Sequence, residues 1–383
     1  MGQFVKWIKR YPTMLYVPLW AGLLTLPFIG PWSALRVAFV FGFAVVLRKL
    51  VHAGPLENGI KKAAHAARSR LQAASRSLAV RVNSTATTVL ALSLLLILPF
   101  FLNDYYRDIT TLTGMYIILA LGLNIIVGQA GLLNLGYVAF YAIGAYTYAI
   151  LSTGYGLAFW PGLVAGALSS ALFAVLLGLP TLRLRGDYFA IVTLGLGEIT
   201  RIILNNWDSV TGGPNGISQI GRPVIAGYTL HSTMDFYYLV LGMVLVAVFT
   251  MRRLIASRIG RAWIAIREDE LAAESMGIDT FRLKLLAFVL GSVCAGVAGV
   301  FFAAKMAFVS PESFTFFESV LILCMVVLGG MGSIGGIILG AFFLIMLPEV
   351  FRDFQDYRML AFGTALVLMM TFRPQGLLGA MKK

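Results

Sequence analysis

Charged residues are scarce in this chain of 383 residues, where Asp, Glu, Lys and Arg together make up 12%. Soluble globular domains have about 25% charged residues. Apolar residues make up 59% of the chain, and the mean hydropathy is +0.86. This composition excludes soluble enzymes, disordered tails and nucleic-acid readers, because each of these classes needs more exposed charge. It predicts an integral membrane protein.

Residues that build disulfides, metal sites and nucleophilic centres are few or wrongly spaced. The two cysteines, Cys294 and Cys324, lie in apolar runs, and the three histidines, His52, His65 and His231, lie far apart. No GxxxxGK(S/T) phosphate loop, HExxH zinc motif or GxSxG nucleophile motif is present. We therefore predict no catalytic residue, no metal site and no cofactor in this chain, which is not expected to be an enzyme.

Apolar runs long enough to cross a bilayer recur along the chain. A membrane-spanning helix needs about 20 mostly apolar residues, because its backbone amides must be satisfied within the helix. Several of the runs are short or interrupted by glycine. The sequence therefore predicts an all-α polytopic membrane protein with about 10–12 transmembrane helices, some broken or re-entrant. The runs lie at 12–29, 31–47, 85–102, 111–128, 133–151, 158–179, 188–205, 236–251, 284–304, 315–330, 335–351 and 359–372.

Lys and Arg are unevenly distributed between these runs. Positively charged loops are retained on the cytoplasmic side during membrane insertion. When both termini are placed on that side, 23 of the 30 basic residues fall in inner segments. The other seven are scattered singly or in one pair over the outer side or within helices. We therefore predict that both termini are cytoplasmic.

Three polar segments interrupt the apolar pattern. Residues 48–84 hold eight basic residues and one acid, which predicts a cytoplasmic amphipathic helix on anionic lipid headgroups, with partner binding as the alternative. Residues 206–235 form the longest outer loop, whose glycine-rich turn at 211–216 is either a rigid connection or a surface that receives a partner. Residues 252–284 mix acids, bases and apolar residues at helical spacing, and Gly277 lies where a helix commonly ends. This pattern predicts a short docking helix on the inner face.

Polar side chains interrupt two of the apolar runs. Asn124, Gln129 and Asn134 lie among glycines, and the backbone groups of a broken helix must face protein or a water-filled cavity. This segment is therefore either part of a translocation path or a kink. Glu198 and Arg201 share one helix face. Placing an ionised side chain at the centre of a bilayer costs about 2.5–3.5 kcal/mol of insertion free energy. Glu198 therefore either lines a cavity or pairs structurally with Arg201.

Glycine is frequent, with 40 residues, and often recurs at a spacing of four, as at Gly162 and Gly166 or at Gly336 and Gly340. Small residues at that spacing allow helix backbones to approach closely in lipid. The GxGxxG pattern at 330–335 joins two apolar runs and lacks the strand and crossover of a dinucleotide site. It predicts a tight turn between closely packed helices.

Five segments share their pattern with one known family. They are GLNIIVGQAGLLNLGYVAFYAIGAY at 122–146, RLRGDYFAIVTLGLGEITRIILNN at 183–206, TGGPNGI at 211–217, IREDELAAESMGID at 266–279 and VVLGGMGSIGGIILGA at 326–341. Together they resemble the membrane-spanning subunits of ATP-binding-cassette importers for branched-chain and other hydrophobic amino acids, within them the LivM-type permease. The resemblance divides the chain into a variable N-terminal membrane extension, 1–110, and a permease core, 111–375.

The resemblance implies roles for residues in three places. It implies that the loop at 252–284 holds a coupling helix that fits a cleft on an ATPase subunit, and that the outer loop receives a periplasmic substrate-binding protein. The residues expected to couple to the ATPase are Arg267, Glu270, Ala272, Ala273 and Gly277. Those expected along the translocation path are Asn124, Gln129, Asn134 and Glu198. Those expected to meet the binding protein are Thr211, Gly212, Gly213 and Asn215.

The same resemblance implies a bacterial inner-membrane assembly. Its expected partners are a second homologous permease subunit, two ATP-binding subunits, the periplasmic binding protein and membrane lipid, with no nucleic acid. ATP is then bound by the partner subunits, and leucine, isoleucine or valine moves inward. Two alternatives remain open at this point: a permease for urea or short amides, and an ion-gradient-driven secondary carrier that uses Glu198 as its coupling site.

Overall fold

The computed structural model describes residues 84–350, apart from Arg185 and Ala226, together with Gly363. The chain divides into two compact units, Met1–Leu94 and Leu95–Lys383, and the helices below belong to the second unit except for the beginning of the first helix, α5. The apolar runs predicted at 12–29, 31–47 and 359–372 lie outside the described residues. The basic segment predicted at 48–84 also lies outside them, apart from Ser84.

Each apolar run predicted between 85 and 350 forms a helix over most of its length, and the all-α polytopic fold is confirmed. Four of the helices, α6, α8, α11 and α14, are long and apolar enough to cross a membrane. The helix that follows the glycine-rich break begins later than the predicted 133, because Asn134 and Gly136 lie in an irregular segment. The helices are α5 (Ser84–Phe101), α6 (Asp104–Asn124), α7 (Val138–Tyr155), α8 (Phe159–Thr181), α9 (Asp187–Asn206), α11 (Thr233–Ala256), α14 (Thr280–Met306), α15 (Phe316–Gly329) and α16 (Ile334–Val350).

Shorter elements lie between these helices. A π-helical turn, η1 (Ile125–Gln129), directly continues α6. Strand β1 (Ile217–Ser218) pairs antiparallel with β4 (Phe308–Val309), so that Ile217 faces Val309, and β2 (Val224–Ile225) pairs with β3 (Tyr228–Thr229). The loop predicted at 206–235 is therefore structured and is tied to the chain that follows α14. The remaining elements are α10 (Asp208–Thr211), η2 (Gly213–Asn215), α12 (Arg258–Glu268), α13 (Glu270–Ser275) and η3 (Pro311–Phe314).

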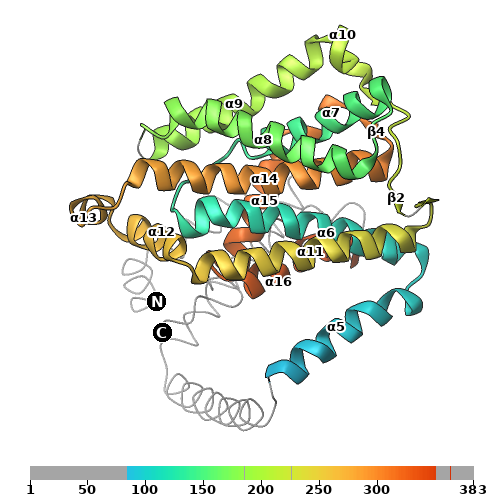
Figure 1. Ribbon diagram of the computed structural model, residues 1–383, viewed down its shortest axis with the longest axis horizontal. Helices are drawn as coiled ribbons and strands as arrows, with labels where there is room; N and C mark the ends of the chain where they lie inside the picture. Colours follow the sequence, from blue (N-terminus) through green and yellow to red (C-terminus); the bar gives the residue numbers. More distant parts are fainter. Residues whose placement is uncertain (1–83, 185, 226, 351–362, 364–383) are drawn as a thin grey trace, which may run out of the picture. The chain divides into compact units, whose positions relative to one another are not determined.

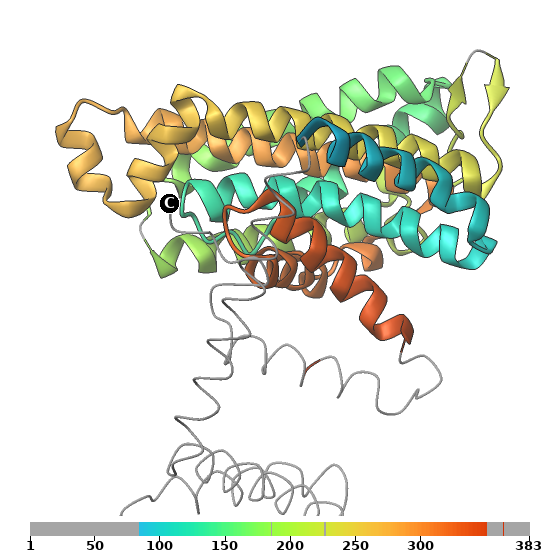
Figure 2. The ribbon, with the colours of Figure 1, turned by 90° about the horizontal axis from the view of Figure 1, so that it is seen from below.

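Helix α6 is the central helix of the second unit. It packs against α11, α14, α15 and α16, and Figure 1 shows α6, α11 and α14 running alongside one another. A helix that is apolar on all sides is normally buried. In the 18-residue apolar stretch of the span Asp104–Gln129, which contains α6, 83% of the residues are buried, compared with 17% in the corresponding stretch of α11. The short helices α12 and α13 lie at one end of this group and α10 lies at the other end (Figures 1 and 2).

Small residues bring α7, α8 and α14 into close contact. A Cβ atom on Gly144 of α7 would overlap the carbonyl oxygen of Gly296 in α14, and one on Gly166 of α8 would overlap the side chain of Val300 in α14. A Cβ atom on Gly336 would likewise overlap the carbonyl oxygen of Gly329 across the turn between α15 and α16. The packing predicted from glycine spacing is therefore present in both places.

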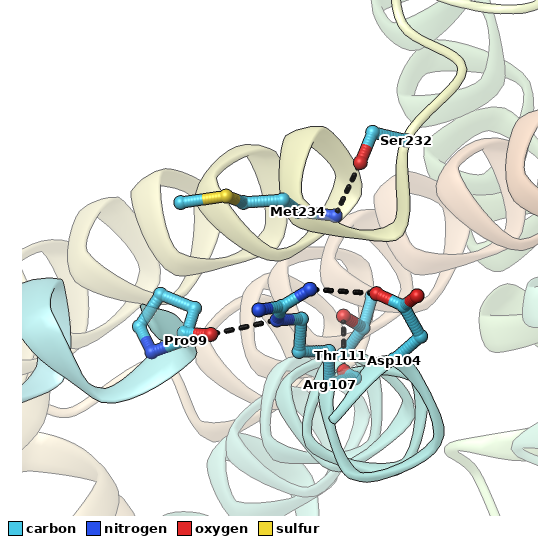
Figure 3. Close-up of polar contacts among 6 residues, drawn as sticks. All are labelled: Pro99, Asp104, Arg107, Thr111, Ser232 and Met234. Carbon is cyan, nitrogen blue, oxygen red and sulfur yellow. Dashed lines mark hydrogen bonds and ion pairs between the residues drawn. The ribbon is translucent and has the colours of Figure 1, made fainter. Parts of the chain in front are cut away.

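Arg107 links the end of α5 to the first turn of α6 (Figure 3). Its Nε donates to the carbonyl oxygen of Pro99 at 2.6 Å, and its Nη1 lies 2.6 Å from Asp104 Oδ1. Pro99 lies in the last turn of α5, where carbonyl groups lack helical amide partners, so Arg107 supplies the missing donor. In the same view, the Ser232 side chain accepts from the Met234 amide at 3.2 Å and caps the beginning of α11.

Candidate functional site

The segment predicted to hold one docking helix forms two short helices, α12 and α13. The Asp269 side chain accepts from the Ala272 amide at 3.0 Å and so caps the beginning of α13. Gly277 follows α13 with a φ of +84°, and the Ile278 amide donates back to the Ala273 carbonyl at 3.1 Å. This geometry is the glycine-terminated helix end predicted from the sequence.

Both short helices are anchored to the beginning of α14. Trp263 of α12 is fully buried, and its Nε1 donates to the Leu283 carbonyl at 2.8 Å. Glu270 of α13 forms an ion pair with Lys284, with 2.5 Å between Oε1 and Nζ, and the Lys284 side chain is only 9% exposed. A buried ammonium group needs such a partner. The position of α13 is therefore fixed relative to α14.

Two large apolar residues are exposed on α13 and at its end, beside the exposed polar residues Glu274 and Ser275. Leu271 is 66% exposed and Met276 is 82% exposed, whereas Ala273 is 4% exposed and packs inward. Of the residues predicted for ATPase coupling, Ala272 and Gly277 are exposed, and Glu270 is engaged with Lys284. Leu271 and Met276 belong to the apolar positions of the predicted docking helix but were not among the residues predicted for coupling, although a large apolar residue on a helix outside the membrane was an available signal.

The fifth predicted coupling residue, Arg267, bonds to the segment that holds two of the predicted path residues, Asn124 and Gln129. Its Nη1 donates to the Gly128 carbonyl in the π-helical turn at 2.5 Å. Asn124 Oδ1 accepts from the Gly332 amide at 2.8 Å, and Gln129 Nε2 donates to the Gly332 carbonyl at 3.3 Å. The turn between α15 and α16 is thus bonded to the end of α6. We call Asn124, Gly128, Gln129, Arg267 and Gly332 the α12 junction.

Asn134 lies apart from this junction, in the irregular segment between η1 and α7. Its Oδ1 accepts from the Gly136 amide at 3.0 Å. Thr193 of α9 and Ser319 of α15 accept from the amides of Leu135 and Val138 at 3.2 and 3.0 Å. The backbone groups freed by the break are thus largely satisfied by neighbouring helices.

Two amide groups in this region have no such partner. The Nδ2 atoms of Asn124 and Asn134 are buried and have no hydrogen-bond acceptor among the described residues. Buried donors of this kind are uncommon in folded proteins. Their position beside the interrupted helix leaves both interpretations of the break open, as a path and as a kink.

Glu198 pairs with Arg201 within α9. Its Oε1 accepts from Arg201 Nε at 2.9 Å and also contacts Arg201 Nη2. Both side chains are partly exposed on α9, and neither contacts the α12 junction. The structural pairing foreseen from the three-residue spacing is therefore present. Among the described residues, no group of three His, Cys, Asp or Glu side chains is placed to hold a metal ion.

Apolar grooves lie between helices of the described residues, and two of them adjoin α8. One of 690 Å³ is lined by α6, α8, α11 and α14, and one of 490 Å³ is lined by α7, α8, α9 and α10. Tyr146, Thr200 and Thr211 are among the polar residues of the smaller groove. Neither groove is lined by the predicted path residues, so the assignment of that path stays a prediction.

The predicted outer-loop residues have two different structural roles. Thr211 is buried, and its Oγ1 donates to the Leu204 carbonyl at 2.6 Å. Gly212 has a φ of +72°, and a Cβ atom on Gly213 would overlap the Asp208 carboxylate. These three residues shape the turn, whereas Asn215 is exposed and is available to a partner.

The chain matches known proteins over most of its length. A family model described as "Branched-chain amino acid transport system / permease component" matches residues 105–372. The chain is 50% identical over 322 residues to the "High-affinity branched-chain amino acid transport system permease protein LivM" of Escherichia coli (strain K12), covering 77% of this chain and 76% of that protein. The protein of the same name from Salmonella typhimurium (strain LT2) is 50% identical over 303 residues, covering 73% of this chain and 71% of that protein.

A more distant relative is the "Autoinducer 2 import system permease protein LsrC" of Shigella flexneri, which is 28% identical over 289 residues, covering 71% of this chain and 80% of that protein. No solved structure gives a significant match to the chain. The family model covers well over half of the chain. This chain is also identical to each of the two LivM proteins at half of the aligned positions. The chain therefore belongs to the family of branched-chain amino acid transport permeases.

Proposed function

We propose that this chain is the transmembrane permease subunit of an ATP-binding-cassette importer that moves branched-chain amino acids inward across the bacterial inner membrane. Family membership and the 50% identity to two LivM proteins support this function. The ion-gradient alternative is not favoured, because the Glu198 carboxylate that it requires is paired with Arg201. The urea alternative has no relative among these matches that favours it.

The observation that best supports energy input from outside the chain is the geometry of α13. Leu271 of α13 and Met276 directly after it are exposed large apolar residues, and the helix is anchored to α14 through Glu270 and Lys284. Large apolar side chains exposed on a helix of six residues, which is too short to cross a membrane, favour contact with another protein. We assign the surface around these two side chains to the cleft of an ATP-binding subunit, with Ala272 and Gly277 at its edge.

We propose the orientation and the remaining partners from the two ends of the helix bundle, one holding α13 and the other holding α10. The α13 end and both termini face the cytoplasm, and the α10 end, with Asn215 exposed, faces the periplasmic binding protein. A second homologous permease completes the membrane part, and two ATP-binding subunits complete the inner part.

We also propose Asn124, Gln129, Asn134 and Glu198 as residues along the path of the substrate. The buried Nδ2 groups of Asn124 and Asn134, which have no acceptor among the described residues, support this assignment. A passing carboxylate can accept a hydrogen bond from such a donor.

The test uses the full importer, reconstituted in liposomes with the binding protein outside and ATP inside. The double variant Leu271→Asp with Met276→Asp should lose the ATP-binding subunits on co-purification and should lose leucine uptake. Arg261→Gln is the matched control, because this exposed residue of α12 hydrogen-bonds to the Ala256 carbonyl at the end of α11, and it should keep both.

Concentrative leucine uptake by this chain alone, with no other polypeptide present, would contradict the proposal. Retention of the ATP-binding subunits by the double variant would contradict the docking surface.

A further inference from the structure

Arg267 satisfies a backbone group that the interrupted helix leaves open. The amides of Ala130 and Leu132 donate to the carbonyl groups of Ile125 and Ile126, and then the chain leaves the helix. The carbonyl groups at such an end need donors from elsewhere in the protein. The Gly128 carbonyl receives its hydrogen bond from Arg267 Nη1, at 2.5 Å, across 139 positions of sequence. An arginine of α12 therefore completes the end of the α6–η1 segment.

Backbone shape at two glycines makes room for this side chain. Gly131 has a φ of +74°, and a Cβ atom there would lie 2.7 Å from Arg267 Cγ. Gly332 has a φ of +88°, and a Cβ atom there would lie 3.7 Å from Arg267 Nη1. The guanidinium group therefore lies close to both the η1 segment and the turn between α15 and α16. Glycine is the residue that adopts these φ values without strain.

Other side chains of α12 and α13 are bonded to α11 and α14. Trp263 and Glu270 attach the two short helices to Leu283 and Lys284 at the beginning of α14. Among the described residues, Arg267 is the side chain of α12 or α13 that hydrogen-bonds to the η1 segment. Arg267 lies on α12 directly before α13, so a displacement of these two short helices relative to α6 would stretch or break the Arg267 contact.

The contact is also suited to being exchanged. The Arg267 side chain is 34% exposed, and its Nη2 lies 3.1 Å from Glu268 Oε1 on the same helix. An arginine has five donors in one planar group, so it can keep one partner while it releases another. π-Helical turns are frequent at functional sites. The junction thus has the properties of a contact with two arrangements, which is what coupling between distant sites requires.

We propose that Arg267 is a positioning residue that transmits the movement of α13 to the π-helical turn of α6 and to the turn between α15 and α16. Bonding of Arg267 to the Gly128 carbonyl holds these segments in the arrangement seen here, and release of that bond frees them. Asn124 and Gln129 extend the effect to Gly332, because both bond to its peptide groups. This role rests on the proposed function, since the force on α13 comes from the ATP-binding subunit.

The experiment compares Arg267→Met, Arg267→Lys and Arg261→Met in the full reconstituted importer. Methionine keeps an unbranched apolar side chain and removes every donor, lysine keeps the charge and a donor, and Arg261 is an exposed residue of the same helix. We measure leucine molecules transported per ATP hydrolysed, together with hydrogen exchange of the amides in 125–132 and in 280–306.

For Arg267→Met we expect about a tenfold fall in leucine transported per ATP, within the range of known coupling energies. Its ATP-binding subunits should still co-purify, because Leu271 and Met276 are unchanged. Exchange in 125–132 should rise while exchange in 280–306 stays at the wild-type rate. Arg267→Lys should recover part of the transport ratio, and Arg261→Met should match the wild type.

A wild-type transport ratio for Arg267→Met would overturn the inference. Loss of the ATP-binding subunits, or faster exchange in 280–306 as well, would also overturn it, since either result indicates a general structural role. The proposed function fails in a distinguishable way: in that case the wild-type importer itself shows no ATP-dependent leucine uptake.

Discussion

Two regions of this protein are held together by different kinds of contact. In the packed group of α7, α8 and α14, backbones meet at Gly144, Gly166 and Gly296, where a single added Cβ atom would overlap its neighbour. In the α12 junction, side chains reach across to backbone groups, as Arg267 does to the Gly128 carbonyl. The first kind of contact depends on shape, and the second depends on hydrogen bonds that have alternative partners.

This difference separates a scaffold from a moving part. Close backbone packing in lipid gains stability from many weak dispersion contacts and has one good arrangement. A charged hydrogen bond at a partly exposed position can exchange its partner, including for water, at modest cost. We therefore expect substitutions in the packed group to unfold the protein and substitutions near the junction to change how it works.

The largest expected effect is in the packed group. Gly144→Ala places a methyl group against the Gly296 carbonyl and should lower the free energy of unfolding by about 3 kcal/mol, the upper part of the range for overpacking. The control, Gly154→Ala, lies in the same helix and has no atom near its Cβ position, so it should raise stability by about 0.5 kcal/mol. Unfolding in mixed detergent micelles measures both. Equal stability of the two variants would remove the distinction between the regions.

An intermediate effect is expected where α13 joins α14. Glu270→Ala leaves the Lys284 ammonium group buried without its partner and should cost about 2 kcal/mol, less than for a fully buried pair, because the Glu270 side chain is 32% exposed. Lys284→Met should cost less, because the remaining carboxylate can turn to water. The same unfolding assay measures the loss of unfolding free energy for both variants, and the loss should be larger for Glu270→Ala than for Lys284→Met. A larger cost for Lys284→Met would show that the ammonium group is less isolated than its exposure indicates.

The smallest expected effect concerns the beginning of α7. Ser319→Ala removes the hydroxyl group that accepts from the Val138 amide at 3.0 Å, and should cost about 1 kcal/mol. Ser313→Ala is the control, since its hydroxyl group makes a longer contact of 3.4 Å with Ser310, and it should stay within about 0.5 kcal/mol of the wild type. Similar values for the two serines would mean that water or a neighbouring group replaces Ser319 as the acceptor.

The sequence predicts the helices of this fold well and its contacts less well. Apolar runs locate the helices, because a membrane requires long apolar segments and allows few alternatives. The spacing of glycines likewise predicts the close packing at Gly166 and Gly336. The bond from Arg267 to Gly128 could not be predicted, since it joins residues 139 positions apart and depends on how α12 is oriented.

At the candidate site, too, the sequence predicts the helix but not all of its contacts. The position of the docking helix and its end at Gly277 follow from local sequence patterns. These patterns do not predict which residues face outward, because Asp269 divides the segment into two helices and changes the direction of the second helix. Ala273 therefore packs inward, and Leu271 and Met276 form the exposed surface.

Helix α14 has 27 residues without a break and is therefore about 40 Å long. At one end Lys284 is bonded to Glu270, and just beyond the other end Val309 pairs with Ile217 of the loop that follows α9. A single rod of the protein thus touches the structures exposed at both ends of the helix bundle. Because α14 also belongs to the closely packed group, it holds these two structures at a fixed separation, and neither can shift along α14 without disturbing the glycine contacts at Gly296.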